Sequence, residues 1–329
     1  MTKIARRAVL AGALAAPLAA PLIARNGFAQ GGYPNKQIRM VVPFAAAGTT
    51  DLLGRIVAQY LTEVWGQQVI VDNKTGAGGN VGAEVVYRAE PDGYTLLCSP
   101  PGPLSINHNL YKTLPYDWSK FSAIGVLALV PNVITARPDL PQASLKDFID
   151  YAKANPGKAT YASQGNGSTS HLSASMLATL AGIELVHVPY KGEGPALVDL
   201  TGSRVDIFIG NISAALRFEK AKQARFLGLA SRTRSPVAPD VPTTAELGYP
   251  DLVSSAWFAL VAPPGTPDAV VQKVNADLVA ALKLPELRAR FVELGAEPQG
   301  GTTAATAGFI KDEEARWRGV IKSANVTLE

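Results

Sequence analysis

The α/β character of this chain is set in residues 38–72, which read IRMVVPFAAAGTTDLLGRIVAQYLTEVWGQQVIVD. Residues 38–43 form an apolar, strand-like run. Residues 51–65 then place apolar side chains three and four positions apart, the spacing of one face of a helix. A second apolar run follows at residues 69–72. Strand, helix and strand in succession predict a βαβ unit with parallel strands.

The same alternation continues outward from this unit. A helical pattern over residues 81–89 and a strand-like run at residues 94–98 extend it to βαβαβ. Further strands are expected at residues 124–136, 159–163, 184–190, 205–209, 226–231 and 257–262. Further helices are expected at residues 144–154, 169–181 and 194–201, and one more from Pro267 onward, with the proline at its first position. Ser144 and Asp147 form a capping box at the start of one of these helices.

Two such α/β sets predict two lobes that are joined by more than one crossing of the chain, with a ligand cleft between them. We place lobe 1 in residues 30–132 plus 232–329 and lobe 2 in residues 133–231. Lobe closure requires a hinge, which we expect where strands cross near residues 130–136 and 226–231.

Residues 1–29 have the three parts of an export signal: a basic start that ends in paired arginines, an apolar run over residues 8–24, and small residues at Gly27 and Ala29 before a cleavage site. The apolar run is rich in alanine and contains two prolines, so it falls short of the ~20 strongly apolar residues of a membrane span. We therefore expect a cleaved signal and an exported protein. The paired arginines resemble a twin-arginine signal, and the general secretory route stays open.

The net charge of +4 lies in this N-terminal segment. The segment holds four of the 31 basic residues and no acidic one, which leaves 27 basic against 27 acidic residues in the remaining chain. A chain without excess positive charge gives no compositional reason to expect nucleic-acid binding. The single cysteine, Cys98, excludes an internal disulfide, and we expect it to be a small buried hydrophobe.

Two loops of the same construction follow strands in the two predicted lobes. Residues 43–51 (PFAAAGTTD) and residues 163–171 (SQGNGSTSH) each join a strand to a helix through small, hydroxyl or amide side chains. Small side chains let the backbone approach a ligand, and free N–H groups at a helix N-terminus favour an anion. Each loop alone is also an ordinary capped helix start. Together they predict two bare helix N-termini in one cleft, where a carboxylate would bind.

No catalytic or cofactor motif is complete in this sequence. Glycine-rich residues 76–82 fail the G-x-G-x-x-G register and are expected to form a tight turn before a helix. The histidines, none of them in a zinc motif, are His108, His171 and His187. We expect His187 to be a strand residue with a satisfied ring. The sequence predicts no cofactor, no metal and no enzyme; the alternative is an enzyme on the same scaffold that uses Cys98 or the Ser168 and His171 pair.

A series of short motifs in fixed order extends from about residue 33 to the C-terminus. They lie at residues 33–38, 42–51, 73–79, 114–117, 154–158, 165–168, 187–192, 241–246, 262–267 and 294–296. Through these motifs the chain resembles the Bug (TctC-like) family, the periplasmic solute-binding proteins of tripartite tricarboxylate transporters. One departure is AAGTT at residues 46–50, where the family commonly has two glycines before its Ser/Thr-Asp pair.

The resemblance implies a type II periplasmic binding protein fold, in which each of two lobes is a mixed sheet flanked by helices. It implies a monomeric receptor that closes on a di- or tricarboxylate, an aromatic acid or an acidic amino acid. The ligand would pass to the large and small membrane permease subunits of a transporter, and a receptor that signals to a membrane sensor is the alternative within this reading.

In the family, the two loops described above grip one carboxylate, and variable side chains meet the far end of the ligand. Carried over residue by residue, the loop positions are Phe44, Ala47, Gly48, Thr49, Thr50, Asp51, Ser163, Gly165, Asn166, Gly167, Ser168, Thr169, Ser170 and His171. The candidates for the far end are Pro100, Tyr190, Lys191 and Asn211.

Overall fold

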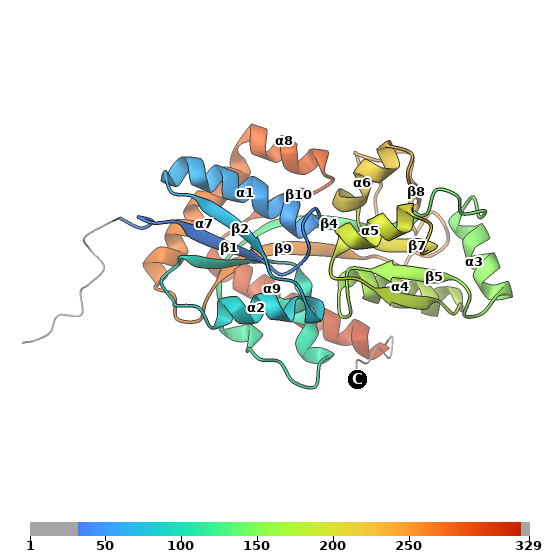
Figure 1. Cartoon of the computed structure of the whole chain (residues 1–329), viewed down its shortest axis with the longest axis horizontal. Coiled ribbons are helices and arrows are strands. Elements are labelled where there is room, and N and C mark those ends of the chain that lie inside the picture. Colours follow the sequence, from blue (N-terminus) through green and yellow to red (C-terminus); the bar gives the residue numbers. More distant parts are fainter. Residues whose placement is uncertain (1–31, 324–329) are drawn as a thin grey trace, which may run out of the picture. The chain divides into compact units, whose positions relative to one another are not determined.

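The computed structural model describes residues 32–323, in which strands and helices alternate as the sequence predicts (Figure 1). The predicted export signal, residues 1–29, lies outside the described residues. All elements named below belong to one unit, residues 34–329. Within residues 32–323, no helix has both the length and the apolar character needed to cross a bilayer.

The strands are β1 (Ile38–Val42), β2 (Val69–Asn73), β3 (Thr95–Ser99), β4 (Ser122–Ala136), β5 (Thr160–Ser163), β6 (Val186–Pro189), β7 (Ile207–Asn211), β8 (Arg225–Leu229), β9 (Ser255–Ala262) and β10 (Glu297–Gly300). The α-helices are α1 (Thr49–Trp65), α2 (Asn80–Tyr87), α3 (Leu145–Ala154), α4 (Thr169–Ala181), α5 (Glu193–Thr201), α6 (Ile212–Lys220), α7 (Asp268–Lys283), α8 (Pro285–Glu293) and α9 (Thr303–Ser323). Short helical turns are η1 (Ala77–Gly79), η2 (Gly102–Ile106), η3 (Asn107–Asn109) and η4 (Trp118–Lys120).

The predicted elements are present within a few residues of their expected bounds, whereas α6, α8, α9 and β10 have no counterpart among them. The glycine-rich turn before α2 is confirmed as η1. The capping box is confirmed at α3, where the Ser144 hydroxyl accepts the Asp147 N–H at 3.1 Å and the Asp147 carboxylate accepts the Ser144 N–H at 3.1 Å. At α7 the structure differs by one residue, since Pro267 is the N-cap and not the first helical residue.

The strands are hydrogen-bonded in the order β2-β1-β3-β9-β4-β7-β5-β6, and β10 and β8 also pair with β4. The long β4 serves two sets of partners: residues 122–131 pair with β9, and residues 132–136 pair with β7. We call β2, β1, β3, β9, β10 and residues 122–131 of β4 the first sheet half. Residues 132–136 of β4 with β7, β8, β5 and β6 form the second sheet half.

Helices cover both faces of the first sheet half. In Figure 1, α1, α7 and α8 lie over one face, and α2 and α9 lie over the other. On the face below α2 and α9, Val41, Leu97 and Trp257 are buried in one apolar cluster with Val86 and Ile310 of those helices. The continuous apolar runs of β1 and β3 follow from this arrangement, because parallel strands buried on both faces have no solvent side.

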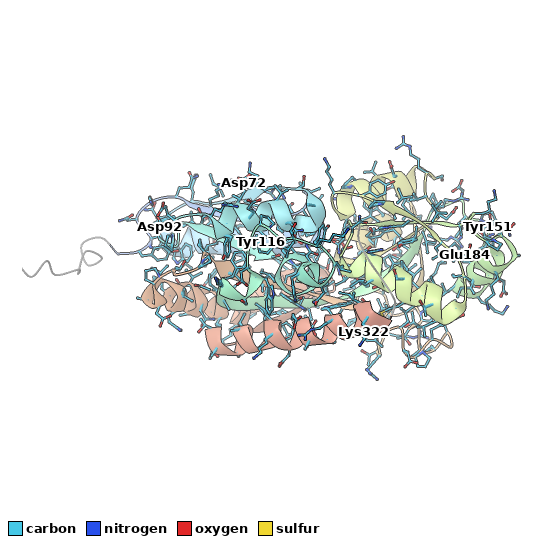
Figure 2. All side chains as sticks on the ribbon, turned by 90° about the horizontal axis from the view of Figure 1, so that it is seen from below. Asp72, Asp92, Tyr116, Tyr151, Glu184 and Lys322 are labelled. Carbon is cyan, nitrogen blue, oxygen red and sulfur yellow. The ribbon has the colours of Figure 1, made fainter. Side chains whose placement is uncertain are left out.

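The second sheet half has its own apolar core. Phe148 of α3 and Leu177 of α4 pack against Ile209 of β7 on one face, and α5 and α6 contact the sheet as well. Figure 2 shows Tyr151 and Glu184 at the end of this unit that is remote from Asp72 and Asp92 of the first sheet half.

The backbone crossings between the halves are hydrogen-bonded to one another. The Asn132 N–H donates to the Ser254 carbonyl at 3.0 Å, the Ala230 N–H donates to the Asn132 carbonyl at 2.8 Å, and the Ser254 N–H donates to the Ala230 carbonyl at 2.8 Å. The fully buried Asn132 amide also donates to the Ser173 and Ser254 hydroxyls, at 3.0 and 2.9 Å. Asn132 and Ala230 lie in the predicted hinge segments, and Ser254, which lies outside them, is hydrogen-bonded to both.

Candidate functional site

A cavity of about 210 Å³ lies between the two sheet halves. Its walls are formed by Phe44, Gly76, Ala77, Gly78, Gly79, Tyr111, Gln164, Gly165, Asn166, Pro189, Tyr190 and Lys191. Around it the loops of the two halves touch. The Ala45 N–H donates to the Lys191 carbonyl at 3.1 Å, and a Cβ built on Gly78 would lie 2.5 Å from the Asn166 carbonyl oxygen. The structure is therefore in a closed arrangement, and small residues permit that closure.

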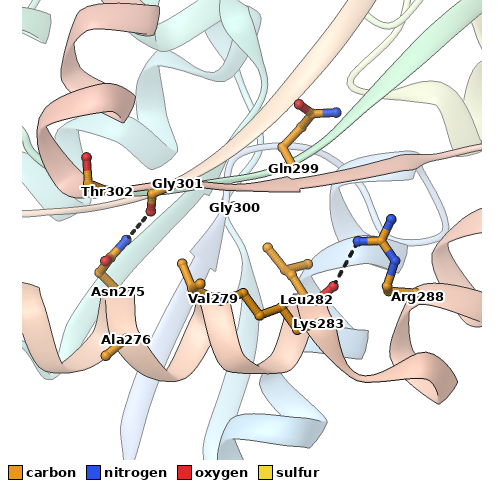
Figure 3. Close-up of a pocket in the computed structure, with 10 residues that line it drawn as sticks. All are labelled: Asn275, Ala276, Val279, Leu282, Lys283, Arg288, Gln299, Gly300, Gly301 and Thr302. Carbon is orange, nitrogen blue, oxygen red and sulfur yellow. Dashed lines mark hydrogen bonds between the residues drawn. The ribbon is translucent and has the colours of Figure 1, made fainter.

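A larger cavity of about 390 Å³ lies between α7 and β10 (Figure 3). All of its lining residues fall within residues 275–302 of the first sheet half. Two of its polar side chains are bonded to the backbone: Asn275 donates to the Gly301 carbonyl at 2.9 Å, and Arg288 donates to the Leu282 carbonyl at 3.2 Å. A ligand in a cavity that one sheet half forms alone would not contact the other half. We therefore take the smaller cavity, which lies between the two sheet halves, as the candidate ligand site.

Asp51, in the first turn of α1, holds the first predicted loop. Its carboxylate accepts hydrogen bonds from the Ala47 N–H, the Arg55 guanidinium and the Asn73 amide, each at 3.0 Å. Asn73 also donates to the Phe44 carbonyl at 2.9 Å. Ala47 has φ 63°, a left-handed conformation that glycine adopts more readily. Burial raises the pKa of Asp51, but the bonds from Arg55 and Ala47 outweigh burial and lower it overall. The carboxylate is thus charged at neutral pH and fixes the loop.

The N-terminus of α1 is not bare, and that part of the sequence prediction is wrong. Oε2 of Glu193, the first residue of α5, accepts the Thr49 N–H at 2.7 Å. Oε1 of the same carboxylate accepts the Asn211 N–H at 2.9 Å. Glu193 is 2% exposed, and burial raises its pKa against the opposing effect of these donors. No local signal marks this residue, because its partner Thr49 lies 144 positions earlier in the chain.

The second predicted loop is ordered by its own hydroxyl groups. Ser168 is the N-cap of α4: its hydroxyl accepts the His171 N–H at 3.2 Å and donates to the Gly165 carbonyl at 2.6 Å. The Ser163 hydroxyl accepts the Gly165 N–H at 3.1 Å. The buried Thr169 hydroxyl has no hydrogen-bond partner among the described residues. The start of α4 is therefore capped, and Thr169 remains able to bond a ligand or a water molecule.

His171 and His187 form a stacked pair beside this loop, with ring centroids 4.4 Å apart. The His187 ring also stacks on Tyr161 and lies 2.6 Å from the Ser163 hydroxyl through Nε2. The prediction of a strand histidine with a satisfied ring is therefore confirmed for His187. Burial lowers the pKa of His171 to about 4, and burial together with His171 lowers the pKa of His187 to about 3. Both rings are neutral at pH 7.

This pair predicts a loss of stability in mild acid. Between pH 7 and 5.5 the unfolded histidines, with pKa near 6.5, take up protons that the folded ones do not, so the free energy of unfolding falls as the pH falls. We expect a loss of about 2 kcal/mol from the pair. Urea unfolding at both pH values measures it, and the His171→Asn, His187→Asn double variant should lose less than the native chain. An equal loss in both proteins would contradict the assignment.

Neither of the two candidate nucleophiles, Ser168 and Cys98, has the neighbouring groups that nucleophilic catalysis needs. Ser168 contacts His171 through the backbone N–H and not through the ring. Cys98 is fully buried on β3, and burial with the nearby charge of Asp51 raises the pKa of its thiol to about 12. Such a thiol is un-ionised at neutral pH and unreactive. Cys98 is the small buried hydrophobe that the sequence predicts.

The structure brings only some of the predicted site residues to the cavity. Those that line it are Phe44, Gly165, Asn166, Tyr190 and Lys191. Those that do not line it are Ala47, Gly48, Thr49, Thr50, Asp51, Pro100, Ser163, Gly167, Ser168, Thr169, Ser170, His171 and Asn211. Asn211 is fully buried with Oδ1 unpartnered among the described residues, and the Tyr190 hydroxyl donates to Asp199 at 2.7 Å.

Gln164 lies in the predicted loop over residues 163–171, although it was not among the residues named singly. The other lining residues are absent from the sequence prediction: Gly76, Ala77, Gly78, Gly79, Tyr111 and Pro189. The segment over residues 76–79 is predicted only as a turn. Its position was nevertheless informative, because it follows β2, which runs parallel to β1, and loops after neighbouring parallel strands emerge at the same edge of a sheet. No comparable signal marks Tyr111.

Comparison with known proteins gives consistent matches over the chain. The family model described as "Tripartite tricarboxylate transporter family receptor", TctC, matches residues 53–326. The R. palustris protein Rpa4515, solved with adipate, superposes with TM-score 0.88 at 37% identity, covering 90% of this chain and 99% of that one. MatC from Rhodopseudomonas palustris, solved with bound malate, superposes with TM-score 0.84 at 33% identity, covering 88% and 100%. The periplasmic binding protein BugD superposes with TM-score 0.87 at 36% identity, covering 90% and 100%.

These matches confirm the predicted fold class, the two-lobed α/β fold of periplasmic binding proteins. The matching proteins are solute-binding receptors and not enzymes, which agrees with the surroundings of Cys98 and Ser168. The predicted resemblance to the Bug proteins is confirmed as well. The chain therefore belongs to the TctC family of tripartite tricarboxylate transporter receptors.

Proposed function

We propose that this protein is a periplasmic receptor that closes its two lobes on a small carboxylate and delivers it to the large and small membrane subunits of a tripartite tricarboxylate transporter. The observation that carries the proposal is the cavity between the two sheet halves, whose walls come from both halves. Its size of about 210 Å³ in the closed arrangement suits a small molecule. We expect the receptor to act as a monomer.

The ligand class follows from the chemistry around this cavity and from the relatives. Lys191 supplies a positive charge at the cavity wall, and a positive charge favours an anionic ligand. The matching proteins solved with adipate and malate each hold a dicarboxylate. We therefore favour a small dicarboxylate over an aromatic acid.

Closure is proposed to take place between residues 30–132 plus 232–329 on one side and residues 133–231 on the other. The hydrogen-bonded crossings at Asn132, Ala230 and Ser254 are the proposed hinge. Small-angle scattering measures the motion: the radius of gyration should decrease when the protein is saturated with a bound acid. An unchanged radius on saturation would rule out closure on the ligand.

A thermal-shift screen against di- and tricarboxylates, aromatic acids and acidic amino acids tests the ligand class. The protein is first unfolded and refolded to remove any bound solute. A ligand at 100 times its dissociation constant adds about 2.7 kcal/mol to the free energy of unfolding, which raises the melting temperature measurably. A selective shift with one class of acid supports the proposal. The absence of a shift with every acid would refute a carboxylate ligand.

The Asp51→Ala variant is expected to bind its carboxylate about 10-fold more weakly, a loss of about 1.4 kcal/mol. The reason is that Ala47 N–H and Asn73 lose the acceptor that fixes the loop over residues 44–48. Calorimetric titration measures the change. Cys98→Ser is the control, because this buried residue on β3 has no part in the cavity wall and its replacement should leave the affinity nearly unchanged. The reverse ranking would contradict the site assignment.

Export is proposed for residues 1–29, with cleavage before Gln30 and a periplasmic location. N-terminal sequencing of the protein recovered from the periplasm tests this proposal. A chain that still begins at Met1 would refute cleavage.

A further inference from the structure

An apolar cluster away from the cavity wall contains side chains from both sheet halves. Leu172, in the first turn of α4 in the second sheet half, is buried in one cluster with four side chains from segments that pack on the first sheet half: Ile106, Leu110, Trp317 and Ile321. We call these five residues the bridging cluster. Figure 2 shows Lys322, next to Ile321, at the end of α9 that reaches the second sheet half.

This end of α9 is fixed to the first sheet half by a polar contact. The Glu314 carboxylate of α9 lies 2.8 Å from Nε2 of His108, in the short turn η3 that follows β3 and η2. Glu314, Trp317 and Ile321 are three and four positions apart, so they share one face of the helix. Trp317 and Ile321 therefore move with the first sheet half, whereas Leu172 moves with the second.

The bridging cluster adjoins the candidate cavity. Tyr111 lines the cavity and also packs against the cluster. Beside it, a Cβ built on Gly167 of the second predicted loop would lie 3.2 Å from a methyl carbon of Leu110 and 2.7 Å from Oδ1 of Asn107. The two halves thus meet closely at the edge of the cavity. Under the proposed closure, a movement that opens the cavity also separates Leu172 from the rest of the cluster.

We propose that the bridging cluster is a remote determinant of affinity: its side chains are buried together only in the closed protein, so their burial adds to the free energy of ligand binding. The inference rests on the proposed function, since it takes lobe closure as the step coupled to binding. Burial of apolar surface is non-directional and favours closure whatever the ligand is. The apparent affinity falls when fewer molecules reach the binding-competent state. The cluster therefore scales the affinity for every ligand by one factor and does not select among ligands.

Two matched pairs of variants test this role. Leu172→Ala truncates the cluster from the second sheet half. Its control is Leu177→Ala, because Leu177 is also fully buried on α4 but belongs to the core of the second sheet half. Ile321→Ala truncates the cluster from the first sheet half, far along the chain from both predicted loops. Its control is Ile310→Ala, because both isoleucines lie on α9 and are 7% exposed, and Ile310 belongs to the core of the first sheet half.

Adipate and malate are the probes, and calorimetric titration measures their affinities. Urea unfolding checks that the two members of each pair lose a similar free energy of unfolding, so that a difference in affinity is not a difference in overall stability. Circular dichroism identifies a variant that fails to fold, in which case the other pair decides.

We expect Leu172→Ala and Ile321→Ala to bind a probe about 10-fold more weakly than their controls, since each removes apolar surface that closure buries. The factor should be the same for each acid that binds. Equal affinities within a folded pair, or a factor that differs between the two acids, would overturn the proposal.

Thiol labelling measures the separation of the cluster without any ligand. Cys98 is fully buried and its thiol is un-ionised at neutral pH, so a maleimide reports on a thiol introduced elsewhere. Leu172→Cys should react faster than Leu177→Cys, because opening of the lobes exposes the first position and only unfolding exposes the second. Equal rates would overturn the proposal. If no protein binds either acid, the proposed ligand class fails, and this comparison of rates alone decides the role of the cluster.

Discussion

The Gly78→Ala variant should lose about 100-fold in affinity for its ligand and still fold. An added Cβ would lie 2.5 Å from the Asn166 carbonyl oxygen and 2.8 Å from the Tyr111 hydroxyl. The Asn166 oxygen is backbone of the opposite sheet half, so it cannot move aside without opening the cleft. A closed state that is destabilised by about 2.7 kcal/mol reduces the apparent affinity by that factor.

The chain offers a close control for this variant. Gly182, after the end of α4, has φ 61°, nearly the same as 62° at Gly78, but a Cβ there meets nothing within 4 Å. Both alanine variants carry the same left-handed strain of about 1–2 kcal/mol, so their melting temperatures should fall alike. Only Gly78→Ala should lose binding in calorimetric titration. Equal affinities of the two variants would show that Gly78 and Asn166 do not approach each other in the bound state.

The Trp257→Ala variant should lose about 3–5 kcal/mol of the free energy of unfolding. Trp257, on β9, is 1% exposed, and its indole N–H donates to Glu313 at 2.9 Å. Its ring meets Phe309 edge to face at 5.5 Å. Truncation to alanine leaves a cavity beneath α9 and an acceptor without its donor, and both effects destabilise the fold.

Urea unfolding followed by circular dichroism measures this loss. Trp257→Phe helps to separate the two causes, since it removes the indole N–H but keeps a smaller aromatic ring in place of the indole. Its loss should be smaller, about 1–2 kcal/mol. If the Trp257→Ala and Trp257→Phe variants lose the same free energy of unfolding, the packing of the ring is not what stabilises β9 against α9.

Local features of the chain could be predicted from sequence because their causes are local. The apolar runs of β1 and β3, the helical period of α1 and the capping box at Ser144 depend on residues a few positions apart. The two polar loops were found for the same reason, since each lies between a strand and a helix. His187 was placed on a strand by its alternation with apolar neighbours.

The features that escaped prediction arise from contacts between distant residues. Glu193 reads locally as an acidic residue at a helix start, which is common, and nothing near it indicates that Thr49 is its partner. The insertion of β9 between β3 and β4 depends on pairing over more than 100 residues. The approach of Gly78 to Asn166 exists only once the two halves are in place. The wall of the cavity was therefore predicted only in part, from the two loops and from Tyr190 and Lys191.

The insertion of β9 also has a consequence for the order in which the chain can assemble. The strands β5, β6 and β7 lie within residues 160–211, so that part of the sheet can pair as soon as this segment is available. The N-terminal strands cannot be completed in the same way, because β3 and β4 are joined only by β9, at residues 255–262. Until β9 is available, β3 and β4 each have an edge with unpaired backbone groups, and such edges are the usual sites of aggregation. A nascent chain that stops after β8 should therefore associate with itself or with a chaperone, although it already contains most of its sheet.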